Sequence, residues 1–478
     1  MAEMLQVPAA GAREPVSPAV ARTWTGEFKA LLTLGWPLII SQLAQNALHT
    51  TDVILMGWLG PGELAAGAVA ASVIICLQLL GVGLVGAVAP MVAQALGAHE
   101  RRGVRRIVRQ GLWVAILLAA IITPIVWNLR PLLLFLGQDP ELAARAEPYS
   151  HTVVWLMAPA FGIVVLRSFL SAHGATQAVL LISVAGVFVN GVVAYALMFG
   201  NWGLPKLGLA GAGVATSTVN FVMFGLMLAY VRLHRKFRRY HILARFFEPD
   251  WPHFRDIFRI GTPIGLMLVA EVALFTSAAL MQGWIGDASV AAHAVALQWG
   301  SLAFMVPLGL SQATTVRVGL AFGERSPEGV RLAGWVSLGV TLVFMACTCV
   351  VFLLFAHNLV GLFLDPAKPE NAQALGLATS FLMVAGVFQL VDGAQVSAGS
   401  ALRGLSDTAV PLMLALVGYW AVGFPVAYVF AFVVGLQGVG IWFGLAAGLA
   451  FAAVSLVTRF ALRERIGLLD KMRRPALA

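Results

Sequence analysis

Long apolar runs, separated by short polar segments, follow one another along nearly the whole chain. A helix needs about 20 apolar residues to cross the hydrocarbon core of a bilayer. The pattern therefore predicts an all-α polytopic membrane protein with twelve spanning helices and no soluble domain inserted between them. We expect the helices at 30–57, 63–96, 105–129, 141–173, 177–200, 207–233, 257–285, 289–322, 330–359, 370–402, 408–434 and 438–463.

Composition agrees with this pattern, because 60% of the residues are hydrophobic and only 11% are charged. Soluble domains carry about 25% charged residues. The net charge of +9 comes largely from basic segments between predicted spans, at 101–109 and 232–259. Basic loops of membrane proteins face the cytoplasm. We therefore expect no nucleic-acid binding, a location in the cell inner (plasma) membrane, and both termini in the cytoplasm.

The chain contains an internal repeat. The segment 35–60, GWPLIISQLAQNALHTTDVILMGWLG, aligns without a gap with 261–286, GTPIGLMLVAEVALFTSAALMQGWIG, at an offset of 226 residues. Two halves of six spans each follow, and because six is even, both enter the membrane in the same direction. We expect two pseudo-symmetric lobes related by an axis along the membrane normal, with a transport pathway between them. The predicted division is a cytosolic tail (1–29), an N-lobe (30–233), a basic cytoplasmic linker (234–256), a C-lobe (257–463) and a second cytosolic tail (464–478).

Few charged residues lie deep in predicted spans, and the carboxylates that we single out among them are Asp52, Glu271 and Asp392. An ionised side chain at the bilayer centre costs about 2.5–3.5 kcal/mol on insertion scales, so such residues usually serve a function. Glu271 and Asp392 belong to the same half and lie at similar predicted depth, and we expect them to share one site. Asp52 lies seven residues beyond Gln45, the repeat equivalent of Glu271.

Two carboxylates in a poorly solvated pocket favour the uptake of a cation. Mutual repulsion and burial favour a proton, whereas added oxygen atoms from Gln389 and Gln395 suit a hard cation such as sodium. The alternative is a neutral, hydrogen-bonded acid that only holds two helices together. Asn190 in the fifth span either joins Asp52 in an N-lobe site or makes a helix–helix hydrogen bond.

Other polar residues in the spans suggest no enzyme chemistry. Arg167, Arg317 and Arg403 fall near the cytoplasmic ends of spans, and we expect their side chains to reach toward the headgroups. The sequence has no phosphate-binding glycine loop, no GxSxG and no HExxH motif. We therefore expect no catalytic activity and no cofactor, and transport driven by an ion gradient.

Several segments together resemble the MATE family (multidrug and toxic compound extrusion), in particular its NorM-type branch. They include GWPLIISQLAQ, TTDVILMGWLG, ATTVRVGLAFGE, FQLVDGAQVSAGSALRGLSDT, YWAVGFPVAY and LQGVGIWFGLAAG. The resemblance implies two six-helix lobes around a central cavity that opens alternately to either side. It also implies export of cationic, often aromatic, compounds in exchange for sodium or protons, by a protein that we expect to be monomeric.

By the same resemblance, Glu271 and Asp392 look like the C-lobe cation-site carboxylates, Asp52 looks like the N-lobe acid, and Asn190 falls on a polar N-lobe position. Two positions depart from the family pattern. Phe388 stands where the NorM pattern can place a tyrosine, and Gly186 stands where relatives can have a second polar residue. These departures leave both sodium and protons open as the coupling ion.

Aromatic residues of the C-terminal half are candidates to line the substrate cavity, because cation–π contacts would add to charge attraction. They are Phe275, Trp299, Phe304 and Phe388, with Gln389 beside them. The alternative for each is packing in the core or against lipid. For the whole chain, the alternative function is that of a flippase or exporter of the same superfamily that carries a lipid-linked saccharide or another metabolite. Such a flippase would need basic residues in its cavity to bind phosphate.

Overall fold

Residues 23–366 and 368–473 are described by a computed structural model of the chain, and they form helices joined by short loops, with no strand among them. Within this part of the chain, eleven helices are long and apolar enough to cross a membrane. A further helix, α1 (Trp24–Leu59), has 36 residues and is also long enough, but polar side chains such as Gln42 and Asn46 interrupt its apolar surface. The expected all-α polytopic class is confirmed. Residues 1–22 and 474–478 of the predicted tails lie outside the described residues.

The helices fall close to the predicted spans. In the first half α1 is followed by α2 (Pro61–Val85), α3 (Val88–Gly97), α4 (Arg101–Trp127), α5 (Leu129–Phe135), α6 (Pro140–Val153), η1 (Val154–Leu156), α7 (Met157–Ala172), α8 (Thr176–Phe199), α9 (Leu209–Leu233) and α10 (Arg235–Arg238). The second half contains α11 (Trp251–Ile285), α12 (Asp287–Gly323), α13 (Pro327–Gly361), η2 (Pro369–Asn371), α14 (Ala372–Gly404), α15 (Ala409–Leu416), η3 (Val417–Gly423), α16 (Phe424–Tyr428), η4 (Val429–Val433), α17 (Gln437–Ala461) and α18 (Asp470–Arg473).

Two helices begin six residues earlier than predicted, at Trp24 instead of 30 and at Trp251 instead of 257. Both are preceded by a residue whose side chain accepts a hydrogen bond from the first turn, Thr23 for α1 and Asp250 for α11. Such N-caps stabilise a helix end regardless of hydrophobicity. A reading based on apolar runs therefore misses the polar first turns.

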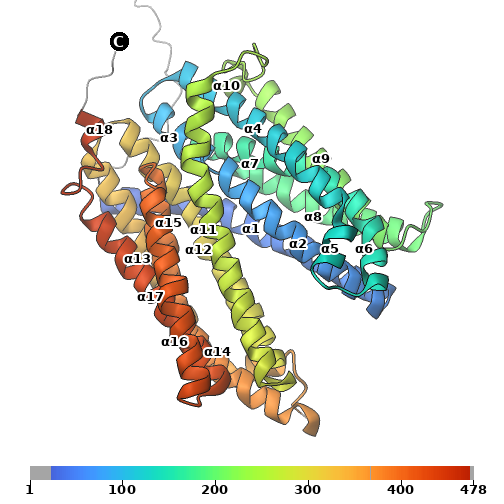
Figure 1. The fold of residues 1–478 in the computed structure, drawn as a ribbon. Helices are drawn as coiled ribbons and strands as arrows, with labels where there is room; N and C mark the ends of the chain where they lie inside the picture. Colours follow the sequence, from blue (N-terminus) through green and yellow to red (C-terminus); the bar gives the residue numbers. More distant parts are fainter. Residues whose placement is uncertain (1–22, 367, 474–478) are drawn as a thin grey trace, which may run out of the picture.

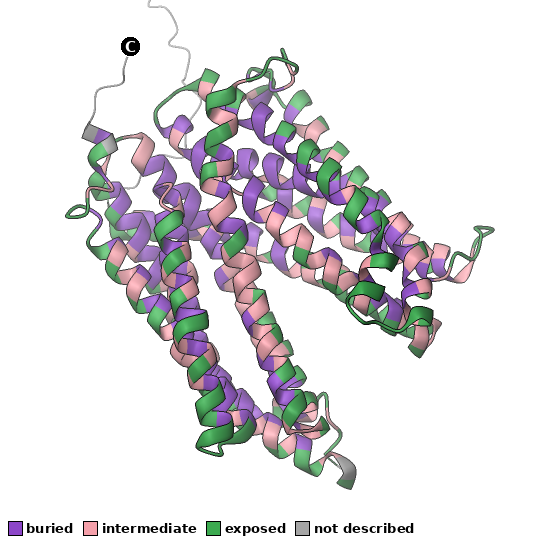
Figure 2. Ribbon diagram, viewed as in Figure 1, coloured by how far each residue is buried: buried purple, intermediate pink, exposed green. Residues whose placement is uncertain are grey.

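The helices form two bundles, one from each half of the chain (Figure 1). The bundles lie together at the end that carries α10 and α18 and diverge toward the opposite end. Between the bundles, α1 packs against α12 and α2 packs against α11. Exposed residues line the outer faces of the helices, and buried residues concentrate between them (Figure 2).

Close contacts between the lobes follow the sequence repeat. A methyl group on Gly97 would lie 2.2 Å from the Leu320 carbonyl oxygen, and one on Gly323 would lie 2.1 Å from the Gln94 carbonyl oxygen. The partners are repeat equivalents, because 323 − 97 and 320 − 94 both give 226. The same relation connects the contact of Gly35 with Leu310 to that of Gly261 with Leu84, and the contact of Gly83 with Gly265 to that of Gly309 with Ile39. The lobes therefore meet about a pseudo-two-fold axis, as expected for parallel repeats.

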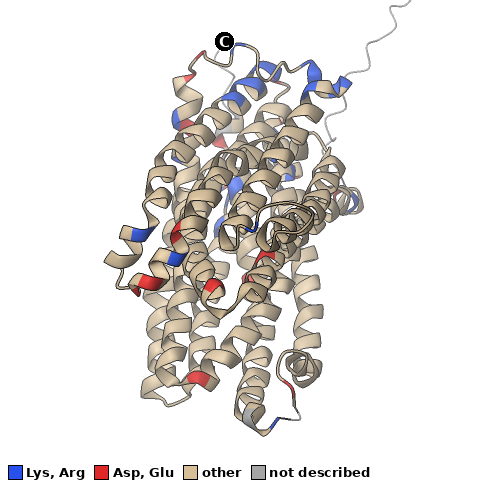
Figure 3. Cartoon of the chain, turned by 90° about the vertical axis from the view of Figure 1, so that its right-hand side faces the viewer, with Lys and Arg blue, Asp and Glu red and all other residues tan. Residues whose placement is uncertain are grey.

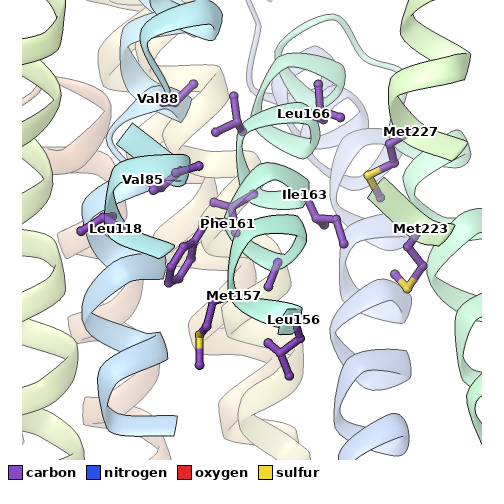
Figure 4. Packing of buried hydrophobic residues seen from close by; sticks show 14 of the residues in the cluster. Val85, Val88, Leu118, Leu156, Met157, Phe161, Ile163, Leu166, Met223 and Met227 are labelled. Carbon is purple, nitrogen blue, oxygen red and sulfur yellow. The ribbon is translucent and has the colours of Figure 1, made fainter. Parts of the chain in front are cut away.

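The core of the N-lobe forms around α7 (Figure 4). The Phe161 ring extends from α7 toward Val85 and Leu118. It packs so closely on α2 that a methyl group on Gly81 would lie 2.3 Å from the ring. Met223 and Met227 lie on the other side of α7. Large side chains set against glycine bring these helices close together, which is the usual way that helices pack in a membrane.

The basic segment between the lobes lies against the N-lobe. Arg109 of α4 donates a hydrogen bond of 2.8 Å to the Arg245 carbonyl oxygen, and the Trp113 indole donates one of 2.8 Å to that of Phe246. Lys236 of α10 donates to the His173 carbonyl oxygen at the end of α7. The segment is thus held by α4 and α7 up to the start of α11.

Candidate functional site

Asp392 lies in the middle of α14 in the core of the C-lobe, with only 4% of its surface exposed. Among the described residues, its Oδ1 atom has no hydrogen-bond partner. Glu271, on α11, is half-buried, and the two carboxyl groups interact electrostatically. The expectation that these two acids lie near each other in the C-lobe agrees with this geometry. Their role in coupling stays a prediction.

Two glutamines on α14 flank Asp392, one turn to either side. Gln389 donates through Nε2 to the Gly300 carbonyl oxygen of α12 at 3.1 Å. Gln395 donates through Nε2 to the Tyr419 hydroxyl at 2.5 Å. Both amide groups use their donor in this way, and within the described part of the chain both Oε1 atoms stay unpaired although buried. With Asp392, α14 therefore presents three buried oxygen acceptors that lack a donor.

The hydroxyl of Tyr419 lies beside these groups, and the sequence analysis did not single it out. Tyr419 lies in the π-helical segment η3 and is fully buried, and it interacts electrostatically with both Glu271 and Asp392. The segment YWAVGFPVAY was noted for its resemblance to the family, but nothing in its apolar pattern separates Tyr419 from a packing residue. A tyrosine hydroxyl needs a polar partner when it is buried. That requirement was the one signal available.

The N-lobe holds a second carboxylate site. The Asn190 amide donates to Asp52 Oδ1 at 2.7 Å, and the Thr216 hydroxyl lies 2.9 Å from Asp52 Oδ2. This bond joins α8 to α1, so it agrees with both interpretations that the sequence analysis left open for Asn190; Thr216 was missed. Met223 fills the space beside Gly186, where a Cβ would lie 2.5 Å from the Met223 sulfur. The Met223 side chain thus occupies the place that a second polar side chain would take.

The aromatic candidates for the substrate cavity do not form one group. Phe275 and Phe388 contact each other with ring centroids 6.0 Å apart. The Trp299 ring instead packs on Phe363, and its indole donates to a carbonyl oxygen of α13. Phe304 is half-buried and has no ring contact with another described aromatic residue. Of the set, only Phe275 and Phe388 are neighbours, close to Asp392 on α14.

The expectation that Arg317 reaches toward the headgroups is wrong. Arg317 of α12 is 3% exposed, and it forms a bidentate ion pair across the lobes with Glu27 of α1, through Nε–Oε1 at 2.8 Å and Nη2–Oε2 at 2.5 Å. Glu27 was placed in the tail because it precedes the apolar run. Arg167 is also turned inward and donates to Gln42 of α1 at 3.1 Å. Arg403 is half-buried and interacts electrostatically with Glu271.

Comparisons with known proteins agree with this architecture. The family model described as MatE matches residues 37–196 and 263–429, so the two matches begin 226 residues apart, as the internal repeat does. A curated relative from Mesorhizobium japonicum, named probable multidrug resistance protein NorM, is 46% identical over 96% of this chain and 97% of its own. A relative of the same name from Rhizobium meliloti is 44% identical over 92% of this chain and 94% of its own.

Solved structures share the fold. The crystal structure of the eukaryotic MATE transporter AtDTX14 superposes with a TM-score of 0.84 at 20% identity, covering 94% of this chain and 99% of that one. The family model matches both halves of the chain, and the NorM relatives align along nearly all of it. The chain is therefore a multi-pass membrane protein that belongs to the MatE family.

Proposed function

We propose that the protein is a secondary multidrug efflux transporter, which exports cationic, aromatic compounds in exchange for sodium or protons by alternating access. The names of the NorM relatives support drug efflux. The coupling ion is the only small cofactor in this proposal, and the chain has no catalytic activity of its own. We propose that it acts as a monomer.

One observation carries the proposal: α14 holds buried oxygen acceptors that have no donor within the described residues, on Asp392, Gln389 and Gln395. A buried acceptor without a partner costs about 1–3 kcal/mol. A cation removes this cost, because it binds several oxygen atoms at once. A site made of acceptors in apolar surroundings thus suits a cation and not an anion.

The same site accounts for exchange. A cationic substrate that lies against the half-buried Phe275 would be attracted by the charge of Glu271 and Asp392 and by the face of this ring, whereas Phe388 is buried in the core. A coupling cation that binds the two acids neutralises part of this charge and so weakens substrate binding. Entry of one cation through the membrane potential releases about 2.3 kcal/mol per 100 mV. The gradient therefore supplies the free energy for export.

The basic residues support an orientation. Lys and Arg gather at the end of the molecule that carries α10 and the C-terminus (Figure 3). By the positive-inside rule this end faces the cytoplasm, which places both termini inside the cell, at the cell inner membrane. The lobes diverge at the opposite end. The conformation is thus outward-facing. The division at residues 30–233, 234–256 and 257–463 stays part of this proposal.

The alternative, a flippase for lipid-linked saccharides or another metabolite exporter, has less support. Such a protein would bind a phosphate group, which needs donors such as Arg or Lys. The unpaired buried groups in the middle of α14 are acceptors instead, and Asp392 among them is an acid. The basic residue of this helix, Arg403, lies near its end and interacts electrostatically with Glu271. The chemistry of the site favours a cation.

Efflux from vesicles tests the proposal. The purified protein would be reconstituted into liposomes loaded with ethidium, an aromatic cation, and a sodium gradient and a pH gradient would be imposed separately. We expect one of the two to drive ethidium across the membrane. Equal, slow leakage with either gradient and with none would contradict antiport.

A further inference from the structure

We infer that the Tyr419 hydroxyl is an oxygen of the C-lobe coupling site, where it contacts the coupling cation together with Asp392 and so sets the affinity for that ion. This inference rests on the proposed function. It assigns to α15–η3 a role in ion selection that belongs to neither α11 nor α14.

The first argument is the position of the hydroxyl group. Tyr419 is 0% exposed, and its oxygen accepts the 2.5 Å hydrogen bond from Gln395 Nε2. A phenol oxygen that accepts one bond keeps a second lone pair and its own proton. The hydroxyl therefore has unused capacity to bind a cation or to donate to a carboxylate. Both Asp392 and Glu271 are near enough to interact with it electrostatically.

The second argument is the backbone that carries Tyr419. The segment Val417–Gly423 is one of two π-helical segments in the span that runs from α15 to η4, the other being Val429–Val433. A π-turn costs regular hydrogen bonding and is found often at functional sites, because the extra residue turns side chains to a new direction. The wide turn fits because α17 approaches closely: a methyl group on Gly418 would lie 2.7 Å from the Gly448 carbonyl oxygen. Small residues thus permit a local geometry that directs Tyr419 into the core.

The third argument is the set of atoms around the hydroxyl. Asp392 Oδ1 and Gln395 Oε1 are buried acceptors for which the described residues provide no donor. Phe388, one turn before Asp392, has no oxygen to add, and its ring packs edge-on against Trp442 at 5.8 Å. Tyr419 supplies the missing oxygen from a different helix. For sodium this oxygen is a ligand; for a proton it is a hydrogen-bond donor to the ionised carboxylate.

Tyr419→Phe tests the inference, because it removes only the hydroxyl oxygen and keeps the ring. Tyr428→Phe is the matched control, since Tyr428 follows on the same span but is 47% exposed and packs on Phe432. Ethidium efflux would be measured in vesicles against increasing sodium or proton concentration, whichever drives the wild type. With sodium as the coupling ion we expect the half-saturating concentration to rise about tenfold for Tyr419→Phe, which corresponds to about 1.4 kcal/mol. With protons we expect it to fall by about the same factor, because the hydroxyl donates to the ionised carboxylate and so disfavours its protonation. It should stay unchanged for Tyr428→Phe.

A second measurement separates this role from packing. Ethidium affinity in the absence of the coupling ion should be the same for Tyr419→Phe and the wild type, because the ring stays in place. A variant that weakens ethidium binding and ion binding alike, or that keeps the wild-type ion dependence, would overturn the inference. If Tyr419→Phe fails to give a monodisperse protein, Tyr419→Met decides, since it also removes the hydroxyl oxygen from this buried position and keeps an apolar side chain. We expect it to shift the half-saturating concentration in the direction given for Tyr419→Phe, and an unchanged value would overturn the inference.

Failure of the inference differs from failure of the proposed function. If the wild type shows no ion-driven efflux, or if Asp392→Asn keeps it, the proposed coupling site itself is wrong. If Asp392→Asn abolishes coupling while Tyr419→Phe behaves as Tyr428→Phe does, only the role of Tyr419 is overturned.

Discussion

The two lobes share one scaffold but treat their buried acids differently. In the N-lobe both oxygen atoms of Asp52 have a neighbouring donor, Asn190 at 2.7 Å and Thr216 at 2.9 Å. In the C-lobe Asp392 has an oxygen with no donor in the described part of the chain. A carboxylate with two donors is stabilised without a cation, whereas one with a free oxygen is not. The contrast indicates that the C-lobe site needs the cation more than the N-lobe site does.

The repeat explains how such a difference arises without a change in fold. The contacts between the lobes are equivalent pairs, such as Gly97 with Leu320 and Gly323 with Gln94. The acids are not equivalent, because the position that matches Glu271 is Gln45. The symmetric contacts hold the scaffold, and the asymmetric side chains give each lobe its chemistry.

The largest expected effect is the loss of coupling in the C-lobe. Glu271→Gln and Asp392→Asn each remove one negative charge with little change in shape. We expect both to abolish ion-driven ethidium efflux, because the cation then loses its charged ligand. The thermal midpoint of Asp392→Asn should not fall, since an unpaired buried charge is removed. Efflux at the wild-type rate from either variant would remove that residue from the mechanism.

The next effect tests the symmetric contacts. Gly97→Ala and Gly323→Ala would place a methyl group 2.2 Å and 2.1 Å from a backbone oxygen of the other lobe. Overpacking of this kind costs about 1–3 kcal/mol. We expect both variants to disfavour, to the same degree, the conformation in which the lobes meet at the basic end.

Cross-linking of Gln94→Cys to Ser406→Cys by a bifunctional thiol reagent measures that conformation, since Gln94 Nε2 and Ser406 Oγ lie 2.9 Å apart across the lobes. The background would lack the native Cys76, Cys347 and Cys349. Gly225→Ala is the control, because no atom lies within 4 Å of the added methyl group. Unequal losses for Gly97→Ala and Gly323→Ala would contradict the pseudo-two-fold contact.

In the N-lobe the expected effect is on stability. Asp52→Ala removes both acceptor oxygens, so the Asn190 amide loses its partner and the Thr216 hydroxyl keeps only the Ala212 carbonyl oxygen. We expect a loss of about 1–3 kcal/mol, measured as a lower thermal midpoint. A midpoint that falls no further than that of Asp392→Asn would remove the contrast between the lobes. The ion dependence of efflux by the same variant tests the prediction that Asp52 also takes part in coupling.

The smallest effect concerns a single hydroxyl. The one proton of Thr216 lies between Asp52 Oδ2 at 2.9 Å and the Ala212 carbonyl oxygen at 3.0 Å. Thr216→Val should therefore cost about 0.5–1.5 kcal/mol. Thr276→Val is the matched control, because Thr276 is exposed and bonds only its own helix, at the Val272 carbonyl oxygen. Equal midpoints for the two variants would mean that Thr216 does not stabilise Asp52.

The sequence predicted the fold well because hydrophobicity alone determines where a chain crosses the bilayer. The predicted span ends lie within six residues of the helix ends, and the largest errors are the polar first turns at Trp24 and Trp251. The offset of 226 residues also predicted which residues of the two halves are equivalent. The span ends depend on residues close in sequence, and the equivalence of the halves depends on the internal repeat, so both can be predicted without knowledge of contacts between helices.

The sites were predicted in part. Asp392 with Gln389 and Gln395 was accessible because helical spacing places them near one another on one helix. Thr216, Tyr419 and the Glu27–Arg317 pair were missed, because they depend on how different helices are rotated against each other. For Tyr419 a π-turn adds a rotation that a period of 3.6 residues does not contain.

Competition between ion and substrate tests the central claim most directly. Ethidium bound to the purified protein would be followed by fluorescence anisotropy while sodium chloride is added, with choline chloride as the control for ionic strength, and in a second series while the pH is lowered. If the C-lobe acids bind both cations in turn, sodium or acid displaces ethidium from the wild type and fails to do so from Asp392→Asn. Displacement that is the same in both proteins would contradict the account.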